Sequence, residues 1–177
     1  EGVVKLNKWH QHRISQLVSK KLFGSVSGKK ICILGFSFKA NTNDTRESAA
    51  ITICKDLIEE GSYLLIHDPK VKESQITKDL GVEASKDLTH FNNTNMNYSK
   101  GNWYKAEDIY TACQGVDAII VLTDWVEYST ISWKLIAKEV RFPTWVFDAR
   151  SVVNSDEVIE AGLNLWKIGY GLNNQDS

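Results

Sequence analysis

Short apolar runs alternate with helical patterns along the chain, and this alternation predicts the fold class. Apolar runs typical of strands buried on both faces cover residues 30–35, 62–67, 82–84, 117–123, 144–148 and 163–168. Strands of this kind favour a parallel sheet with helices on both faces. We therefore expect an α/β fold, a doubly wound, mainly parallel, six-stranded Rossmann-like sheet preceded by an N-terminal helix.

The helical segments repeat their apolar residues with the 3.6-residue period of one buried stripe. We expect helices over residues 6–23, 44–61, 71–80, 104–114, 131–140 and 154–161. Asn7 is a candidate N-cap for the first helix. The second helix starts with a capping-box pattern in which Asp44 is the N-cap and Glu47 follows three residues later, and Gly61 ends it.

Two segments interrupt the periodic pattern. Residues 24–28 contain two glycines and two serines, which is typical of a linker. Residues 89–103 are rich in Asn, Ser and Thr without periodicity, so we expect a surface insertion there.

Composition excludes several classes of protein. The chain has 177 residues, of which 42% are hydrophobic and 24% charged, as in an ordinary globular domain. A net charge of −1 argues against a nucleic-acid partner. No apolar run approaches the roughly 20 residues that span a membrane, and the N-terminus resembles no signal peptide. Because the chain starts at Glu1 rather than Met, we expect a processed piece or a fragment of a longer protein. We expect that protein to be cytoplasmic, since the cysteines are too few and too scattered for a disulfide framework.

The three cysteines do not suggest chemistry. Cys32, Cys54 and Cys113 each lie inside an apolar pattern, so we expect buried free thiols in a reducing compartment. A cysteine nucleophile is the alternative, but none of the three lies in a Gly-rich or basic loop that would lower its pKa.

The carboxyl ends of the predicted strands are the place to look for a ligand site, since parallel sheets bind ligands there. The relevant segments are 35–46, 68–70, 123–125 and 148–152. The first of them reads Gly-Phe-Ser-Phe-Lys and lacks the three glycines of a dinucleotide fingerprint. It offers instead two cations, Lys39 and Arg46, beside a helix N-terminus, which suits a phosphate or diphosphate. A solvated Lys39 and an Arg46 paired with Asp44 or Glu47 remain the alternative.

Five segments resemble one family, in the family's order. They are GFSFKANTNDTRES at 35–48, HDPKV at 67–71, YTACQGVDAIIVLTDW at 110–125, FDAR at 147–150 and KIG at 167–169. Over nearly all of residues 7–170 the chain resembles the C-terminal domain of the UDP-glucose/GDP-mannose dehydrogenase family. Within this family, the sequence Asp-Thr-Arg-Glu-Ser at 44–48 is most similar to that of the UDP-glucose 6-dehydrogenases.

The resemblance implies a domain organisation and an activity. Residues 1–27 would be the end of the family's central helix plus a linker, and residues 28–177 the UDP-binding domain. The family oxidises UDP-glucose to UDP-glucuronate in two NAD-dependent steps, with NAD bound mainly by an N-terminal domain. The catalytic Gly-Gly-x-Cys motif has no counterpart in this sequence, so we expect no catalytic residue and no activity in the chain alone. A homodimer or higher homo-oligomer is implied as well, with the helix at 6–23 in its interface.

Site residues carry over position by position. The resemblance implies that Phe38, Lys39 and Arg150 contact the UDP-sugar, with Lys39 near the diphosphate, and that Arg46 reaches NAD. Lys39 and Arg150 are then expected at the ends of neighbouring strands, converging on one crevice able to hold UDP. We expect no metal site, because the four histidines show no ligand spacing.

Other interpretations stay open. For Asp68 we favour capping of the turn at Pro69 over ribose binding, and for Trp125 packing over base stacking. The chain could also be a non-catalytic nucleotide-binding or dimerisation module of the same fold. A dehydrogenase for another nucleotide sugar, GDP-mannose or a UDP-N-acetylhexosamine, is the third alternative.

Overall fold

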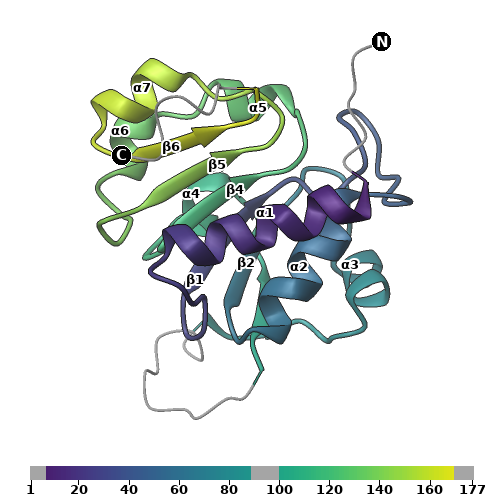
Figure 1. Ribbon diagram of the computed structural model, residues 1–177. Helices are drawn as coiled ribbons and strands as arrows, with labels where there is room; N and C mark the ends of the chain where they lie inside the picture. The colour runs from purple at the N-terminus through teal and green to yellow at the C-terminus, as the bar shows by residue number, and fades with distance from the viewer. Residues whose placement is uncertain (1–6, 89–99, 170–177) are drawn as a thin grey trace.

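The computed structural model describes residues 7–88 and 100–169, and within them one parallel sheet organises the chain. Its six strands run in the order β3-β2-β1-β4-β5-β6 (Figure 1). The strands are β1 Lys30–Leu34, β2 Tyr63–His67, β3 Asn102–Lys105, β4 Ala118–Val121, β5 Trp145–Asp148 and β6 Asn164–Lys167. The helices are α1 Lys8–Lys21, α2 Ala49–Glu59, α3 Glu73–Leu80, α4 Ile109–Ala112, α5 Val126–Ser129, α6 Trp133–Ile136 and α7 Ser155–Glu160. The predicted doubly wound, Rossmann-like class is confirmed.

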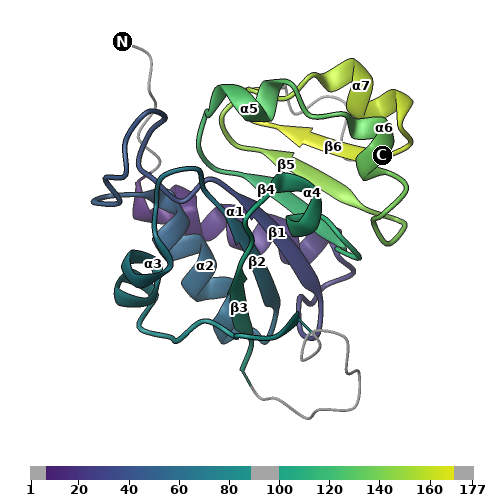
Figure 2. The ribbon, with the colours of Figure 1, turned by 180° about the vertical axis from the view of Figure 1, so that it is seen from behind.

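Both faces of the sheet are covered, which explains why β1, β2, β4 and β5 are apolar at nearly every position. In β1, Ile31 and Ile33 pack with α1, α2 and α3, whereas Cys32 and Leu34 face the core shared with α4 to α7. Figure 1 shows the face with α1, α2 and α3, and Figure 2 shows the same sheet from behind. Two hydrophobic cores, one on each face, therefore hold the layers together.

Helix α1 packs on the sheet domain itself. It begins as predicted, with Asn7 Oδ1 accepting a hydrogen bond from the backbone N–H of His10 at 3.0 Å. Its stripe of Ile14, Val18 and Leu22 is buried in the same core as α2 and β1. In Figure 1 the helix lies across α2 and the middle of the sheet.

The third strand was predicted in the wrong place. Residues 82–84 form no strand, and β3 instead covers residues assigned to the end of the insertion and to a helix starting at 104. The reason is Trp103, whose indole is fully buried and donates from Nε1 to the carbonyl of Val82 at 2.8 Å. One buried tryptophan fixes an edge strand that has no apolar run. Residues 89–99 of the predicted insertion lie outside the described residues.

The capping-box prediction for α2 is also wrong. The N-cap is Ser48, whose Oγ accepts from the N–H of Ala50 at 3.2 Å and donates to the carbonyl of Phe36 at 2.7 Å. Glu47 has a φ of 61°, which no helix adopts, so it cannot be the third residue of a helix. Ser48 thus starts the helix and at the same time ties it to the loop after β1.

The helices on the second face are shorter than predicted. α4 occupies only the middle of the expected 104–114, and α6 only part of 131–140. α5 has no counterpart among the predicted helices. Short helices of one turn leave little room for a 3.6-residue period to show in the sequence.

Candidate functional site

The loops that follow β1, β4 and β5 meet at the carboxyl edge of the sheet. Thr123 Oγ1, just after β4, donates to the carbonyl of Ser37 in the loop after β1 at 2.8 Å. Arg150 Nη1, just after β5, donates to the carbonyl of Phe38 in the same loop at 3.4 Å. The strand ends singled out in the sequence analysis are therefore in direct contact.

Asp68, the residue after β2, is the centre of this edge. Its Oδ2 accepts from the backbone N–H groups of Phe36 at 2.8 Å and Ser37 at 3.0 Å. Its Oδ1 accepts from those of Lys70 at 2.9 Å and Val71 at 3.0 Å. Burial raises the pKa of Asp68, but these four N–H groups outweigh burial and hold the pKa below its ordinary value. The predicted turn-capping role is confirmed, and both oxygens of the carboxylate are taken by the backbone.

Trp125 joins the same centre. Its indole is buried in the second core and donates from Nε1 to Asp68 Oδ2 at 3.3 Å. The prediction that Trp125 packs rather than stacks on a base is confirmed, since both its ring and its N–H are engaged inside the fold.

Asp148, the last residue of β5, repeats the arrangement and fixes the backbone of Arg150. Its fully buried carboxylate accepts from the N–H of Arg150 at 3.0 Å, of Val152 at 2.8 Å and of Val153 at 2.9 Å. Ser151 between them has a φ of 59°, a left-handed conformation that non-glycine residues adopt only where the surroundings impose it. The sharp turn places Arg150 over the sheet edge.

The side chain of Arg150 is held from two sides. Its Nη2 lies 3.3 Å from Asp124 Oδ1, its Nη1 bonds Phe38, and only 17% of the side chain is exposed. Lys39 follows Phe38 directly and is exposed. The two cations therefore belong to one edge, but the strands that carry them are not neighbours as predicted, because β4 lies between β1 and β5.

Arg46 is placed differently from the other two cations. Its Nε donates to Asp44 Oδ1 at 3.0 Å and its Nη2 to Asp44 Oδ2 at 2.8 Å. These hydrogen bonds lower the pKa of Asp44 to about 2. The side chain of Arg46 is 88% exposed, so the pair is a surface pair. This is the pairing that the sequence analysis left open, and a contact of Arg46 with NAD stays a prediction.

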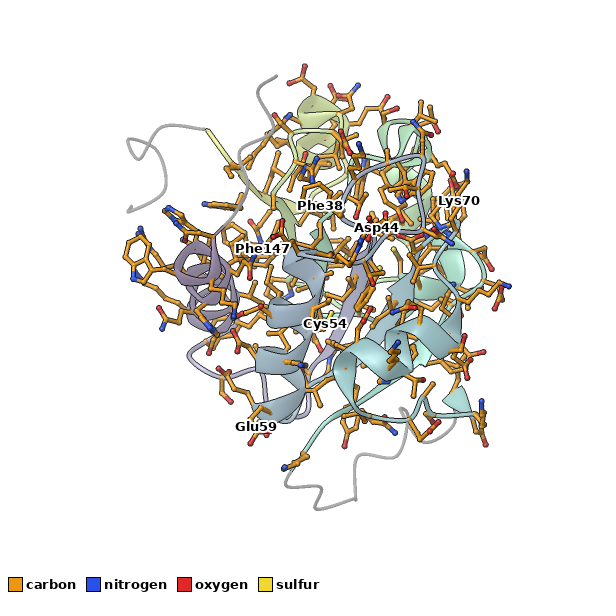
Figure 3. The ribbon with its side chains drawn as sticks, turned by 90° about the vertical axis from the view of Figure 1, so that its right-hand side faces the viewer. Phe38, Asp44, Cys54, Glu59, Lys70 and Phe147 are labelled. Carbon is orange, nitrogen blue, oxygen red and sulfur yellow. The ribbon has the colours of Figure 1, made fainter. Side chains whose placement is uncertain are left out.

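A hollow lies beside the loop after β1. It has a volume of about 380 Å³ and is lined by Asn41, Thr42, Asn43 and Lys70. Figure 3 shows Lys70, Asp44 and Phe38 across the same edge of the molecule. Lys70 lies in the segment 68–70 that the sequence analysis singled out, but no role was predicted for it. A hollow of about 580 Å³ between α6 and α7 shares no residue with these loops.

The three cysteines lie inside the two hydrophobic cores. All three are free and buried, as predicted. Burial raises the pKa of Cys54 and, together with the thiol of Cys113 at 3.7 Å, that of Cys32. A thiol that stays protonated is a weak nucleophile.

Residues 7–88 and 100–169 also bear on membranes and metals. No helix there has the length and apolar character needed to cross a membrane. In the same residues no three side chains of His, Cys, Asp or Glu gather as metal ligands would.

Comparison with known proteins shows the family of the chain. The sequence model of the UDP-glucose/GDP-mannose dehydrogenase family, UDP binding domain, matches residues 32–155. The chain is 37% identical over 173 residues to UDP-glucose 6-dehydrogenase of Drosophila melanogaster, covering 96% of this chain and 34% of that protein. It is 35% identical over 175 residues to UDP-glucose 6-dehydrogenase 3 of Arabidopsis thaliana, covering 96% and 36%. The chain thus spans about a third of the length of these relatives.

Solved structures agree on the fold. A UDP-glucose dehydrogenase of Pyrobaculum islandicum superposes with a TM-score of 0.63 at 22% identity, over 93% of this chain and 30% of that one. An NDP-N-acetyl-D-galactosaminuronic acid dehydrogenase of Methanosarcina mazei gives a TM-score of 0.67 at 19% identity, over 93% and 30%. The matched residues form a domain of the nucleotide-sugar dehydrogenase class. The chain belongs to the UDP-glucose/GDP-mannose dehydrogenase family and corresponds to its UDP binding domain.

We predict that Asp68→Asn destabilises the fold at neutral pH by about 3 kcal/mol, because an amide cannot accept four N–H donors. The folded pKa of Asp68 is lowered, so its contribution is complete above the ordinary value near 3.9 and is lost as the pH falls through the folded pKa. The stability gap between the native chain and the variant should therefore shrink below about pH 4. Urea unfolding at pH 7, 5 and 3 measures this gap.

The control for that experiment is Asp156→Asn, which changes an exposed aspartate on α7. It should shift the free energy of unfolding by less than about 0.5 kcal/mol at each pH. Equal effects of the two substitutions at pH 7 would contradict the role assigned to Asp68.

Proposed function

We propose that this chain binds the UDP end of a nucleotide sugar at the carboxyl edge of its sheet. Lys39 and Arg150 would contact the diphosphate, and Phe38 the substrate beside them. The observation that carries the proposal is the position of Arg150, whose largely buried guanidinium is tied to the loop that presents Lys39. A planar fork and a point charge at one edge of the sheet would suit a diphosphate.

The full-length protein, in this proposal, oxidises UDP-glucose to UDP-glucuronate with two NAD. The relatives that share more than 30% of this sequence are named UDP-glucose 6-dehydrogenases, which favours UDP-glucose over GDP-mannose or a UDP-N-acetylhexosamine. NAD would be held mainly by an N-terminal domain, since the loop after β1 lacks the dinucleotide glycines. Arg46 would break its ion pair with Asp44 and contact NAD across the cleft between the two domains.

The proposal assigns residues 1–27 to the end of a central helix with its linker and residues 28–177 to the UDP-binding domain. The outer side of α1 exposes Trp9 to 62%, and Phe23 just beyond the helix is exposed to 83%. Large exposed apolar side chains on a helix and just beyond its end suit a contact with a second copy of the chain. Three free thiols fit a cytoplasmic location, where disulfides are rare.

Titration of UDP into the chain by calorimetry tests the ligand site. Lys39→Ala and Arg150→Ala should each weaken binding by about 10- to 150-fold, because a charge-assisted hydrogen bond contributes roughly 1.5–3 kcal/mol. Lys20→Ala removes an exposed lysine of α1 and should bind as the native chain does. Native-like affinity in both site variants would refute the proposal.

A second prediction concerns catalysis. Incubated with UDP-glucose and NAD, the chain should produce no NADH, since all three of its cysteines are buried and a buried thiol is poorly placed to attack a substrate. Absorbance at the NADH band, followed at several protein concentrations, measures this. NADH formation in proportion to the amount of pure protein would contradict this prediction, because the reaction would then need no cysteine from outside the chain.

A third prediction concerns association. Sedimentation velocity should show a dimer that the double variant Trp9→Ala/Phe23→Ala converts to monomer, because each buried aromatic contributes roughly 1.5–3 kcal/mol. Leu135→Ala, which removes an exposed apolar side chain of α6, should leave the dimer intact. A native chain that stays monomeric at high concentration would contradict the assignment of α1 as an interface.

A further inference from the structure

Asp124 spans a gap that the strand order creates. Because β4 lies between β1 and β5, no residue of the loop after β1 is adjacent in the sheet to the loop after β5. Asp124 follows β4 and reaches both sides. Its Oδ1 accepts from the backbone N–H of Ala40 at 3.3 Å and lies 3.3 Å from Arg150 Nη2. One carboxylate oxygen thus joins the residue after Lys39 to the second cation of the site.

We propose that Asp124 is a positioning residue that sets Arg150 and the Lys39 loop at the spacing a diphosphate requires, an inference that rests on the proposed function. A free arginine loses rotamer freedom when it binds a ligand, and this loss weakens affinity. Asp124 and the carbonyl of Phe38 hold the guanidinium before any ligand arrives. The guanidinium carries more N–H donors than these two contacts use, so it still binds phosphate.

A simple charge effect would act in the opposite direction. Asp124 is 44% exposed and negative, so by charge alone it repels an anionic ligand, and its removal would strengthen UDP binding. The positioning role requires the reverse, since the loss of Asp124 releases Arg150 and the loop. The sign of the effect on affinity therefore separates the two roles.

The contacts of Asp124 can be removed one at a time. Asp124→Asn keeps an oxygen for the N–H of Ala40 but loses the ion pair with Arg150, and Asp124→Ala loses both. Asp124→Glu keeps the carboxylate with one more methylene. The matched control is Glu127→Gln, which removes an equal exposed charge three residues further on, in α5.

Titration of UDP by calorimetry, with thermal melting recorded on the same samples, is the test. Asp124→Ala should weaken UDP binding by about 5- to 20-fold and Asp124→Asn by less, while Asp124→Glu stays within about threefold and Glu127→Gln matches the native chain. In a chain that already carries Arg150→Ala, the Asp124→Asn substitution should have no further effect, because the ion pair it removes is gone.

The results that overturn the inference are distinct from those that overturn the proposed function. If the native chain binds no UDP, the proposed function fails and this role fails with it. If the native chain binds UDP but Asp124→Ala binds equally well or more tightly, only the positioning role is refuted. The role is also refuted if Asp124→Asn weakens binding equally with and without Arg150, or if melting temperatures fall in parallel with affinity across all variants.

Discussion

The carboxyl edge of the sheet depends on the hydrogen bonds that the carboxylate of Asp68 accepts. A carboxylate has acceptor sites for about four donors, and here the backbone of two different loops fills them. Without it, the buried N–H groups of Phe36, Ser37 and Val71 would lose their partner, and unpaired buried N–H groups are costly. The path of the loop after β1, and with it the position of Lys39, therefore follows from one residue at the end of β2. Asp148 does the same for Arg150 at the end of β5.

Much of the fold could be read from the sequence because both faces of the sheet are buried. β1, β2, β4 and β5 are apolar at nearly every position, and such runs are hard to mistake for loops. β3 was missed because an edge strand needs only one buried side chain, Trp103, among polar neighbours. The start of α2 was predicted in the wrong place because Asp44 matches a capping pattern. Asp44 in fact accepts hydrogen bonds from Arg46, and the local sequence does not distinguish the two roles.

The candidate site was only partly accessible to sequence reasoning. The rule that parallel sheets bind ligands at their carboxyl ends leads to Lys39 and to the segment 148–152 without knowledge of the strand order, and the family resemblance then singles out Arg150. Asp124 could not be identified in that way, because its role depends on β4 lying between β1 and β5. A sequence places residues along a line, and it gives no distance between loops that are far apart on that line.

The residues that contact one another at this edge lie far apart in the sequence, which affects when the edge can form during synthesis. Phe38 and Arg150 are 112 residues apart in the chain, and Ala40 and Asp124 are 84 apart. Contacts this distant form only after the loss of chain entropy has been compensated elsewhere, here by pairing β1 with β4 and β4 with β5. On a ribosome, the edge cannot be complete until β5 has emerged. The proposed nucleotide site thus requires a chain that has been synthesised at least through Arg150.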